Sequence, residues 1–229
     1  ARSLAEIGCS VVLLARNYDA MESLRTELPG SNHEVLAVDL SDLESLKKAV
    51  AGLVERRPVN ILINNSGGPK AGPLLQASER TFSEGLQNHV LASQLLVNLC
   101  LEGMKSTKYG RIIQIISTSV KAPIPNLGVS NTIRGAVASW SKSLSNELGP
   151  YGVTVNNVLP GYTDTERLQE LIKAASSRQG VSEDEIIEIW KAKVPLGRFA
   201  EAQEVANAVA FLASPAAAYI TGINLPVDG

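Results

Sequence analysis

Short apolar runs alternate with longer segments of helical periodicity along the whole chain. Most of the runs are continuously apolar, which is typical of parallel strands that are covered by helices on both faces. This alternation predicts an α/β domain built from parallel βαβ units. The strands are predicted at residues 11–15, 34–38, 60–63, 111–116, 153–158 and 223–227.

Helices are predicted between these strands. Ser41 with Glu44 three residues later forms a capping-box pattern, and Leu43, Leu46 and Val50 then share one helical face. Further helices are predicted over residues 78–104, 127–148, 165–193 (one or two helices with a polar break at 176–180) and 201–212. Residues 1–7 look like the second half of a helix capped by Gly8, so the chain begins in the middle of a βαβ unit.

Length, charge and hydropathy indicate which kinds of molecule the chain binds. The 229 residues suit one domain, and the net charge of -2 provides no electrostatic footprint for nucleic acid or anionic membranes. No apolar run reaches the roughly 20 residues of a membrane helix, and no signal pattern opens the chain, so we expect a cytoplasmic protein with a small-molecule partner. Cys9 and Cys100 are expected to be buried reduced thiols. With only two histidines in the chain, we do not expect a histidine-based metal site.

Several motifs occur together in a family-specific order. Residues 64–67 (Asn-Asn-Ser-Gly) follow the third strand, Asn88 lies in the next helix, Ser117 follows the fourth strand and residues 160–165 (Pro-Gly-Tyr-Thr-Asp-Thr) follow the fifth. With the closing residues 222–229, this set resembles the short-chain dehydrogenase/reductase family over essentially the whole chain. The resemblance is strongest to the beta-ketoacyl-carrier-protein-reductase-like branch.

The resemblance implies a doubly wound, Rossmann-type parallel sheet in a single domain spanning residues 1–229. In that fold the family's first strand lies between the strands predicted here at 11–15 and 60–63, and a Gly-rich phosphate loop follows it. Neither is in this sequence. A hole in mid-sheet would leave two strand edges unpaired, so we expect the sequence to be an N-terminally truncated part of a longer protein. Residues 165–194 are expected to form a substrate lid.

The family context implies a nicotinamide cofactor, and Arg16 favours NADP over NAD. NAD-preferring relatives have an acidic residue where this chain has Ala15, and Arg16 beside it can pair with a 2'-phosphate. The alternative is a solvated arginine in a turn. Asp39 resembles the adenine-contacting carboxylate of the family, although it could equally cap the following helix.

Two further segments are implied to hold the cofactor. Asn64, Ser66 and Gly67 would line the adenosine side, where small residues permit close backbone approach. After Pro160 and Gly161, the backbone of Thr163 and the hydroxyl of Thr165 would hold the nicotinamide carboxamide. The alternative for this second segment is a plain strand-to-helix turn.

The catalytic positions depart from the family pattern. The family uses a Tyr and, four residues later, a Lys; here these positions hold Ser130 and Arg134. A serine hydroxyl titrates far above a phenol, and an arginine stays protonated, so neither replaces the usual proton-transfer pair. Arg134 could still bind ribose hydroxyls, whereas Asn88, the family's relay residue, would become structural if the relay is lost.

Other residues near Ser117 and in the segment after the fifth strand could replace the family's Tyr as the proton donor. Lys121 and Tyr162 are candidate acids if their pKa values are lowered, and each could instead be a solvent-facing or packing side chain. Ser117 and Ser119 are candidate donors to the substrate oxygen.

Three functions remain open from the sequence. The leading hypothesis is an NADP(H)-dependent oxidoreductase of carbonyl or alcohol substrates with a rearranged acid. The others are a catalytically silent NADP-binding subunit or sensor, and cofactor-free lyase or dehalogenase-type chemistry on the same fold. A homo-oligomer, either a tetramer or a dimer, is also expected, since residues 127–148 carry an apolar stripe suited to a helix interface or to packing on the sheet. The identity of the substrate is not encoded in any of these patterns.

Overall fold

The computed structural model describes residues 1–229 and contains six strands in two groups. Strand β1 (Val12–Ala15) pairs with β2 (Glu34–Ala37). A four-stranded sheet has the order β3-β4-β5-β6, and its strands are Ile61–Asn64, Gly110–Ile115, Val153–Pro160 and Asn224–Val227. All pairs are parallel, and every predicted strand is present with its ends within two residues of the prediction.

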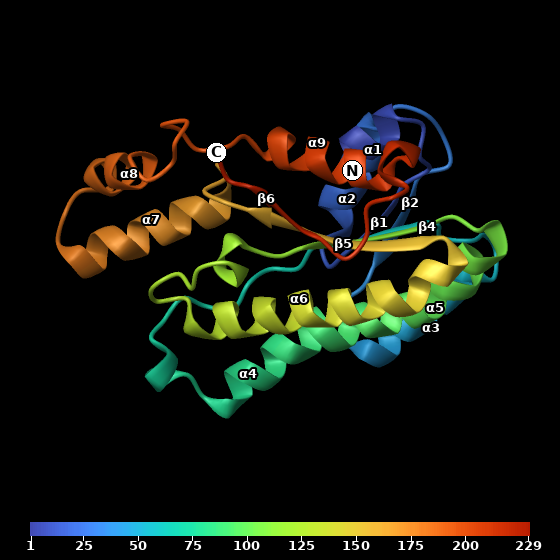
Figure 1. The fold of residues 1–229 in the computed structure, drawn as a ribbon, viewed down its shortest axis with the longest axis horizontal. Helices are drawn as coiled ribbons and strands as arrows, with labels where there is room; N and C mark the ends of the chain where they lie inside the picture. Colours follow the sequence, from blue (N-terminus) through green and yellow to red (C-terminus); the bar gives the residue numbers. More distant parts are fainter.

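Helices cover both faces of the strands, which confirms the doubly wound α/β prediction (Figure 1). One face carries α3 (Leu43–Val54), α4 (Glu79–Leu86), α5 (Ala92–Thr107) and α6 (Gly128–Leu148). The other carries α1 (Arg2–Glu6), α2 (Tyr18–Glu27) and α9 (Ala202–Ala213). Short 3₁₀ turns occur at Leu74–Gln76, Thr118–Val120, Gly149–Tyr151 and Pro215–Ala217.

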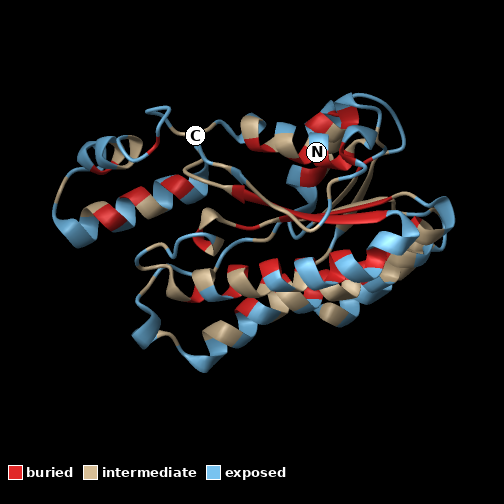
Figure 2. Ribbon diagram, viewed as in Figure 1, coloured by how far each residue is buried: buried red, intermediate tan, exposed pale blue.

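The buried side chains lie on the strands and on the helix faces that meet them (Figure 2). The larger apolar cluster joins α3, α5 and α6 to the sheet, and its fully buried members include Leu46, Met104 and Ile112. A smaller cluster joins α9 to the opposite face through Val209 and Leu212. Burial of apolar area on both faces therefore holds the layers together.

Helices α7 (Glu166–Gln179) and α8 (Glu183–Lys191) project from one end of the molecule (Figure 1). They pack on each other through a separate apolar cluster that includes Leu168, Ile172 and Ile186. The polar break predicted at 176–180 is shorter than expected: α7 continues to Gln179 and ends at Gly180, which has φ +69°. Helix α8 begins with a capping box in which Ser182 and Glu185 bond each other's backbone N–H groups.

Some local predictions were wrong. The capping box at Ser41 does not form, because Ser41 donates to Asp39 and the carboxylate of Asp42 instead accepts from the Ser45 N–H at 3.0 Å. The helix predicted over 78–104 is interrupted by a π-helical turn at Gln87–Leu91 and ends at Thr107. Helix α2, which the sequence analysis did not delimit, is capped by the Asn17 side chain.

The two groups of strands do not hydrogen-bond to each other. The free edge of β1 and the free edge of β3 both border one cavity of about 1630 Å³. This division agrees with the expectation that the family's first strand is absent from the sequence. None of the helices combines the length and the apolar character that crossing a bilayer requires.

A pair of glycine substitutions tests the packing of the sheet. A Cβ added at Gly110 would lie 2.7 Å from Val153 Cγ2 and 2.9 Å from Met104 Cβ, whereas a Cβ at Gly52 in α3 would meet nothing within 4 Å. We expect Gly110→Ala to lower the free energy of unfolding by about 1–3 kcal/mol through overpacking. The control Gly52→Ala should raise it by about 0.5–1 kcal/mol. Urea unfolding followed by circular dichroism measures both, and equal effects would contradict the packing shown here.

Candidate functional site

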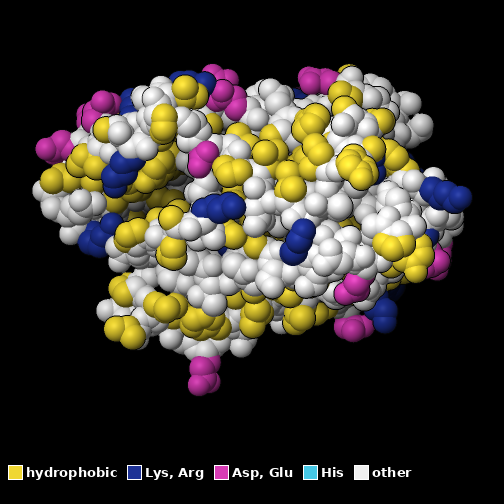
Figure 3. All heavy atoms as spheres, in the orientation of Figure 1, with side chains coloured by type: hydrophobic (Ala, Val, Ile, Leu, Met, Phe, Trp, Pro, Cys, Tyr) yellow, Lys and Arg dark blue, Asp and Glu magenta, His cyan; other side chains and the backbone are white.

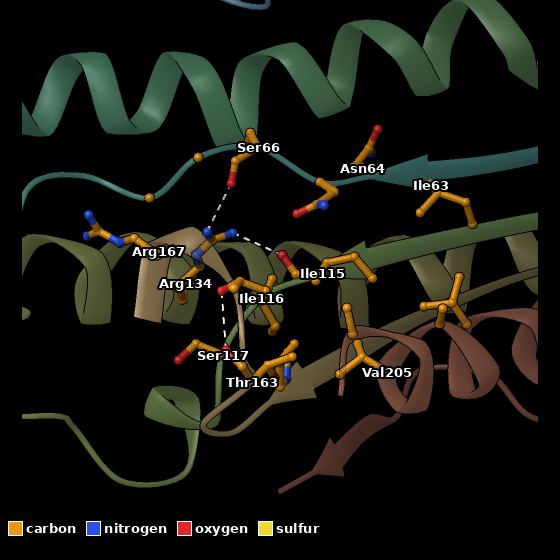
Figure 4. A pocket seen from close by; sticks show the side chains of 18 of the residues that line it. Ile63, Asn64, Ser66, Ile115, Ile116, Ser117, Arg134, Thr163, Arg167 and Val205 are labelled. Atoms are coloured by element: carbon orange, nitrogen blue, oxygen red, sulfur yellow. Dashed lines mark hydrogen bonds between the residues drawn. The ribbon is translucent and has the colours of Figure 1, made fainter. Parts of the chain in front are cut away.

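The large cavity runs past the carboxyl ends of β3, β4 and β5, where sites in doubly wound folds are found. It brings together nearly all the site residues predicted from the sequence. Those that line it are Asn64, Ser66, Gly67, Asn88, Ser117, Lys121, Ser130, Arg134, Pro160, Gly161, Thr163 and Thr165. Figure 4 shows several of them converging from β3, β4, α6 and the segment after β5. Arg16 and Asp39 do not line it.

Ser117 lies just beyond β4 and faces this cavity. Its Oγ accepts from the Ser119 N–H at 3.0 Å, which leaves the Ser117 hydroxyl hydrogen free to donate. Ser119 itself is 4% exposed and does not line the cavity. The prediction that Ser119 donates to the substrate was therefore wrong: its contribution is the backbone N–H that orients Ser117.

Arg134 is buried and acts as a clamp between two strand ends. Its Nη1 donates to the carbonyl of Ile115 at 3.0 Å, and its Nη2 donates to the carbonyl of Ser66 at 3.3 Å (Figure 4). Desolvation, and secondarily the positive charge of Arg167, lower the pKa of Arg134 to about 10. No carboxylate forms an ion pair with it, so this buried cation is held by neutral acceptors alone.

His89, which the sequence analysis did not select, completes the clamp. Its Nδ1 lies 2.5 Å from Ser66 Oγ and 3.4 Å from Arg134 Nη1. Because a guanidinium only donates, Nδ1 is the acceptor and the ring hydrogen sits on Nε2. Burial, followed by the charge of Arg134, lowers the pKa of His89 to about 4, which keeps the ring neutral. Only its place one residue after Asn88 could have drawn attention to it in the sequence.

Two buried amide groups beside the cavity lack partners within the protein. They are the Nδ2 of Asn64, at the end of β3, and the Oδ1 of Asn88, in the π-helical turn. Unpaired buried polar groups are costly, and both residues line the cavity, so these atoms are free to bond a ligand or water there.

The segment after β5 is tightly positioned. A Cβ at Gly161 would lie 2.7 Å from Asp228 Cβ, so only glycine permits this approach. The Thr163 hydroxyl donates to the Gly161 carbonyl at 3.3 Å, and Thr165 Oγ1 accepts from the Leu168 N–H at the start of α7. Thr165 is thus a helix cap as well as a cavity residue.

Arg16 and Asp39 lie together at the ends of β1 and β2. Their charged groups are 4.0 Å apart, and the Arg16 side chain is 81% exposed. Asp39 accepts from both the N–H and the hydroxyl of Ser41 at 2.8 Å, and these bonds lower the pKa of the Asp39 carboxyl. Asp39 therefore stabilises the turn before α3, but the expected alternative of a helix cap was wrong, because Asp42 caps α3. Its contact with adenine stays a prediction.

The two candidate proton donors, Tyr162 and Lys121, have different surroundings. Tyr162 stacks on Trp190 with ring centroids 5.0 Å apart, and burial raises rather than lowers its pKa, so it is a packing residue. Lys121 is exposed, lines the cavity one turn after Ser117 and forms no hydrogen bond or ion pair. Ser130 also lines the cavity without a hydrogen bond. Lys121 is therefore the candidate acid whose side chain lines the cavity without a partner, four residues after Ser117.

The lowered pKa of His89 predicts a pH dependence of stability. Between about pH 6.5 and pH 4 the unfolded chain binds a proton at His89 that the folded chain excludes, so stability falls as the pH drops through this window. The full loss is at most about 3 kcal/mol. His89→Asn keeps an acceptor near the Nδ1 position and does not titrate. Urea unfolding at pH 7.5 and pH 4.5 should show a smaller loss for this variant, and identical losses would contradict the buried neutral ring.

Comparison with known proteins agrees with this geometry. A family model described as enoyl-(acyl carrier protein) reductase matches residues 1–229. The chain is 32% identical to the 3-oxoacyl-[acyl-carrier-protein] reductase FabG of Vibrio cholerae and to that of Escherichia coli, and each match covers 100% of the chain and 89% of the relative.

Solved structures of other proteins share the fold of this chain. YwfH, an NADPH-dependent reductase involved in bacilysin biosynthesis, has a TM-score of 0.93 at 27% identity, covering 99% of this chain and 89% of YwfH. An actinorhodin polyketide ketoreductase with NADPH has a TM-score of 0.93 at 29% identity, covering 100% and 90%. With the parallel sheet, the cavity at its carboxyl edge and the family motifs that line it, these matches show that the chain belongs to the short-chain dehydrogenase/reductase family.

Proposed function

We propose that this chain is an NADP(H)-dependent reductase that acts on carbonyl compounds through a rearranged set of catalytic residues. The observation that carries the proposal is that Ser117, Lys121 and Thr163 all line the cavity that passes the carboxyl ends of β3, β4 and β5. The relatives and neighbours are reductases by name, and two of the neighbours are described with NADPH. The cavity residues support the same chemistry here.

The residues present fit the two ends of such a cofactor. The unpaired Asn64 Nδ2 and the open space around Gly67 suit the adenosine side, and Thr163 with Gly161 suits the carboxamide of the nicotinamide. No Gly-rich loop before a helix lies beside β1 in residues 1–229. When bound, NADPH supplies the hydride for reduction. The exposed Arg16 favours the 2'-phosphate of NADP over the free hydroxyl of NAD.

The protein's own contribution is to hold the carbonyl and supply a proton. Ser117, oriented by the Ser119 N–H, donates its hydrogen to the carbonyl oxygen and stabilises the charge that develops there. Lys121 provides the proton, because it has the free ammonium closest in sequence to Ser117 and no competing partner. Ser130 contributes only a neutral hydroxyl, and Arg134 holds the ends of β3 and β4 in register.

A second candidate function is an NADP-binding subunit or sensor without turnover. The observation that favours it is the engagement of Arg134 on Ile115, Ser66 and His89, which turns the former Lys position into a structural element. The substrate lid, formed by residues 165–194, and a homo-oligomeric state are proposals under either function.

A lysine substitution separates these two functions. Lys121→Met removes the proposed acid, and we expect kcat to fall by roughly 10²–10⁴-fold while NADPH affinity stays unchanged. Lys173→Met is the matched control, because Lys173 is exposed on α7 and does not line the cavity. NADPH oxidation is followed at a fixed ketone concentration, and binding by NADPH fluorescence. Tight NADPH binding with no turnover by the unmodified protein would support the sensor instead.

Cofactor preference tests the role of Arg16. Loss of a charge-assisted bond to the 2'-phosphate costs about 1.5–3 kcal/mol, so Arg16→Ala should weaken NADPH binding roughly 10–100-fold. NADH, which lacks this phosphate, should bind the variant and the unmodified protein equally. Arg25→Ala, in the neighbouring α2 where Arg25 pairs with Glu22, is the control. Fluorescence titration measures each affinity, and an equal loss for both cofactors would contradict the assignment.

A further inference from the structure

We propose that the cavity takes carbonyl substrates that carry a carboxylate or phosphate group, and that Arg134 and Arg167 bind this group. The inference rests on the proposed reductase function and specifies its substrate class. Arg167 was not selected by the sequence analysis, and no motif in the sequence pointed to it.

The charges around the cavity are strongly asymmetric. Asp228 is the only acidic residue that lines it, whereas the basic residues that line it are Arg57, Lys121, Arg134, Arg167, Arg178 and Lys193. Arg167 and Arg178 lie on α7, and Lys193 follows α8. Figure 3 shows a hollow lined by hydrophobic side chains at that end of the molecule, with Lys and Arg side chains near its rim. Such a concentration of one sign of charge in a hollow with apolar walls favours an oppositely charged ligand.

Arg134 provides the buried part of the site. Its side chain is 8% exposed, its partners are two carbonyls and a neutral imidazole, and none of them carries negative charge. A buried charge without a counter-ion is destabilising. An oxyanion in the adjoining cavity would supply that counter-ion, and the guanidinium fork suits both carboxylate and phosphate.

Arg167 provides the second cation. It is the second residue of α7, a position where the helix dipole favours anions over cations. Its Nη2 donates to the Pro69 carbonyl at 3.0 Å and its Nη1 pairs with Glu170 at 3.0 Å, so the guanidinium is fixed in place. It lies close enough to Arg134 to lower that residue's pKa, and Figure 4 shows the two side chains next to each other.

The location specifies the substrate. The two guanidinium groups line the same cavity as Ser117 and Thr163, where the carbonyl and the nicotinamide ring are proposed to meet. The proposed substrate therefore carries the anionic group and the reacting carbonyl in one small molecule, as in a short oxo acid or a phosphorylated ketone. A neutral ketone of the same size would leave Arg134 without a counter-charge.

The test compares matched acid and neutral probes on the whole chain saturated with NADPH. Methyl acetoacetate is the uncharged methyl ester of acetoacetate, and dihydroxyacetone phosphate and dihydroxyacetone form a second pair of charged and neutral ketones. Isothermal titration calorimetry should show that at least one anionic probe binds about tenfold or more tightly than its neutral counterpart. Equal affinity within both pairs would overturn the proposal.

Two arginine variants test where the anionic probe binds. Arg167→Gln should lower the affinity for the anionic probe by about tenfold or more and leave the neutral probe unchanged. Arg80→Gln is the matched control, since Arg80 is also paired within its own helix but lies outside the cavity. An unchanged affinity of Arg167→Gln for the anionic probe would overturn the proposal. Competition between NADPH and the anionic probe would also overturn it, because the arginines would then bind a phosphate of the cofactor. Probe binding that depends on Arg167 but gives no turnover with either anionic probe would leave the anion site standing and favour the sensor over the reductase.

Discussion

The arrangement of the site depends on one buried guanidinium. Arg134 reaches from α6 to the carbonyl of Ile115 at the end of β4 and to the carbonyl of Ser66 in the segment after β3. These two carbonyls are at the carboxyl edge of the sheet, where neither is used by a strand partner. Because a guanidinium presents several donors in a rigid plane, it fixes both chain segments relative to α6 at once. Ser117, two residues after Ile115, is positioned by the same contact.

Arg134 hydrogen-bonds to His89 and to Ser66, and these two residues also contact each other. His89 must remain neutral to accept from Arg134, and its burial lowers its pKa far enough to ensure this. Ser66 contributes its hydroxyl to the imidazole and its carbonyl to the guanidinium. The two positions that hold the family's Tyr and Lys are occupied here by Ser130 and by Arg134, which bonds the carbonyls of Ile115 and Ser66. The Arg134 guanidinium also adds a positive charge beside the cavity.

The sequence by itself determined the layered architecture. Apolar strands alternating with amphipathic segments can be buried only between helices on both faces, so the six strands were predicted within two residues. The resemblance to the family pointed to Asn64, Ser117 and Thr163, which follow or end strands, and the carboxyl ends of parallel strands meet at one edge. The start of the helix predicted from residue 78 and the end of the helix predicted to residue 148 also follow from local sequence, and both agree with the structure to within one residue.

Only the tertiary structure decided which side chains meet across that edge. His89 and Arg134 are separated by 45 residues, and nothing in the local sequence around either one shows that they share a hydrogen bond. Arg167 reaches the loop at Pro69 across 98 residues. The wrong assignments have the same origin: Ser119 is buried and does not line the cavity, and Ser41 bonds Asp39 rather than capping a helix. Periodicity and capping follow from the neighbouring residues, whereas a side chain's partner, exposure and pKa depend on what the fold packs against it.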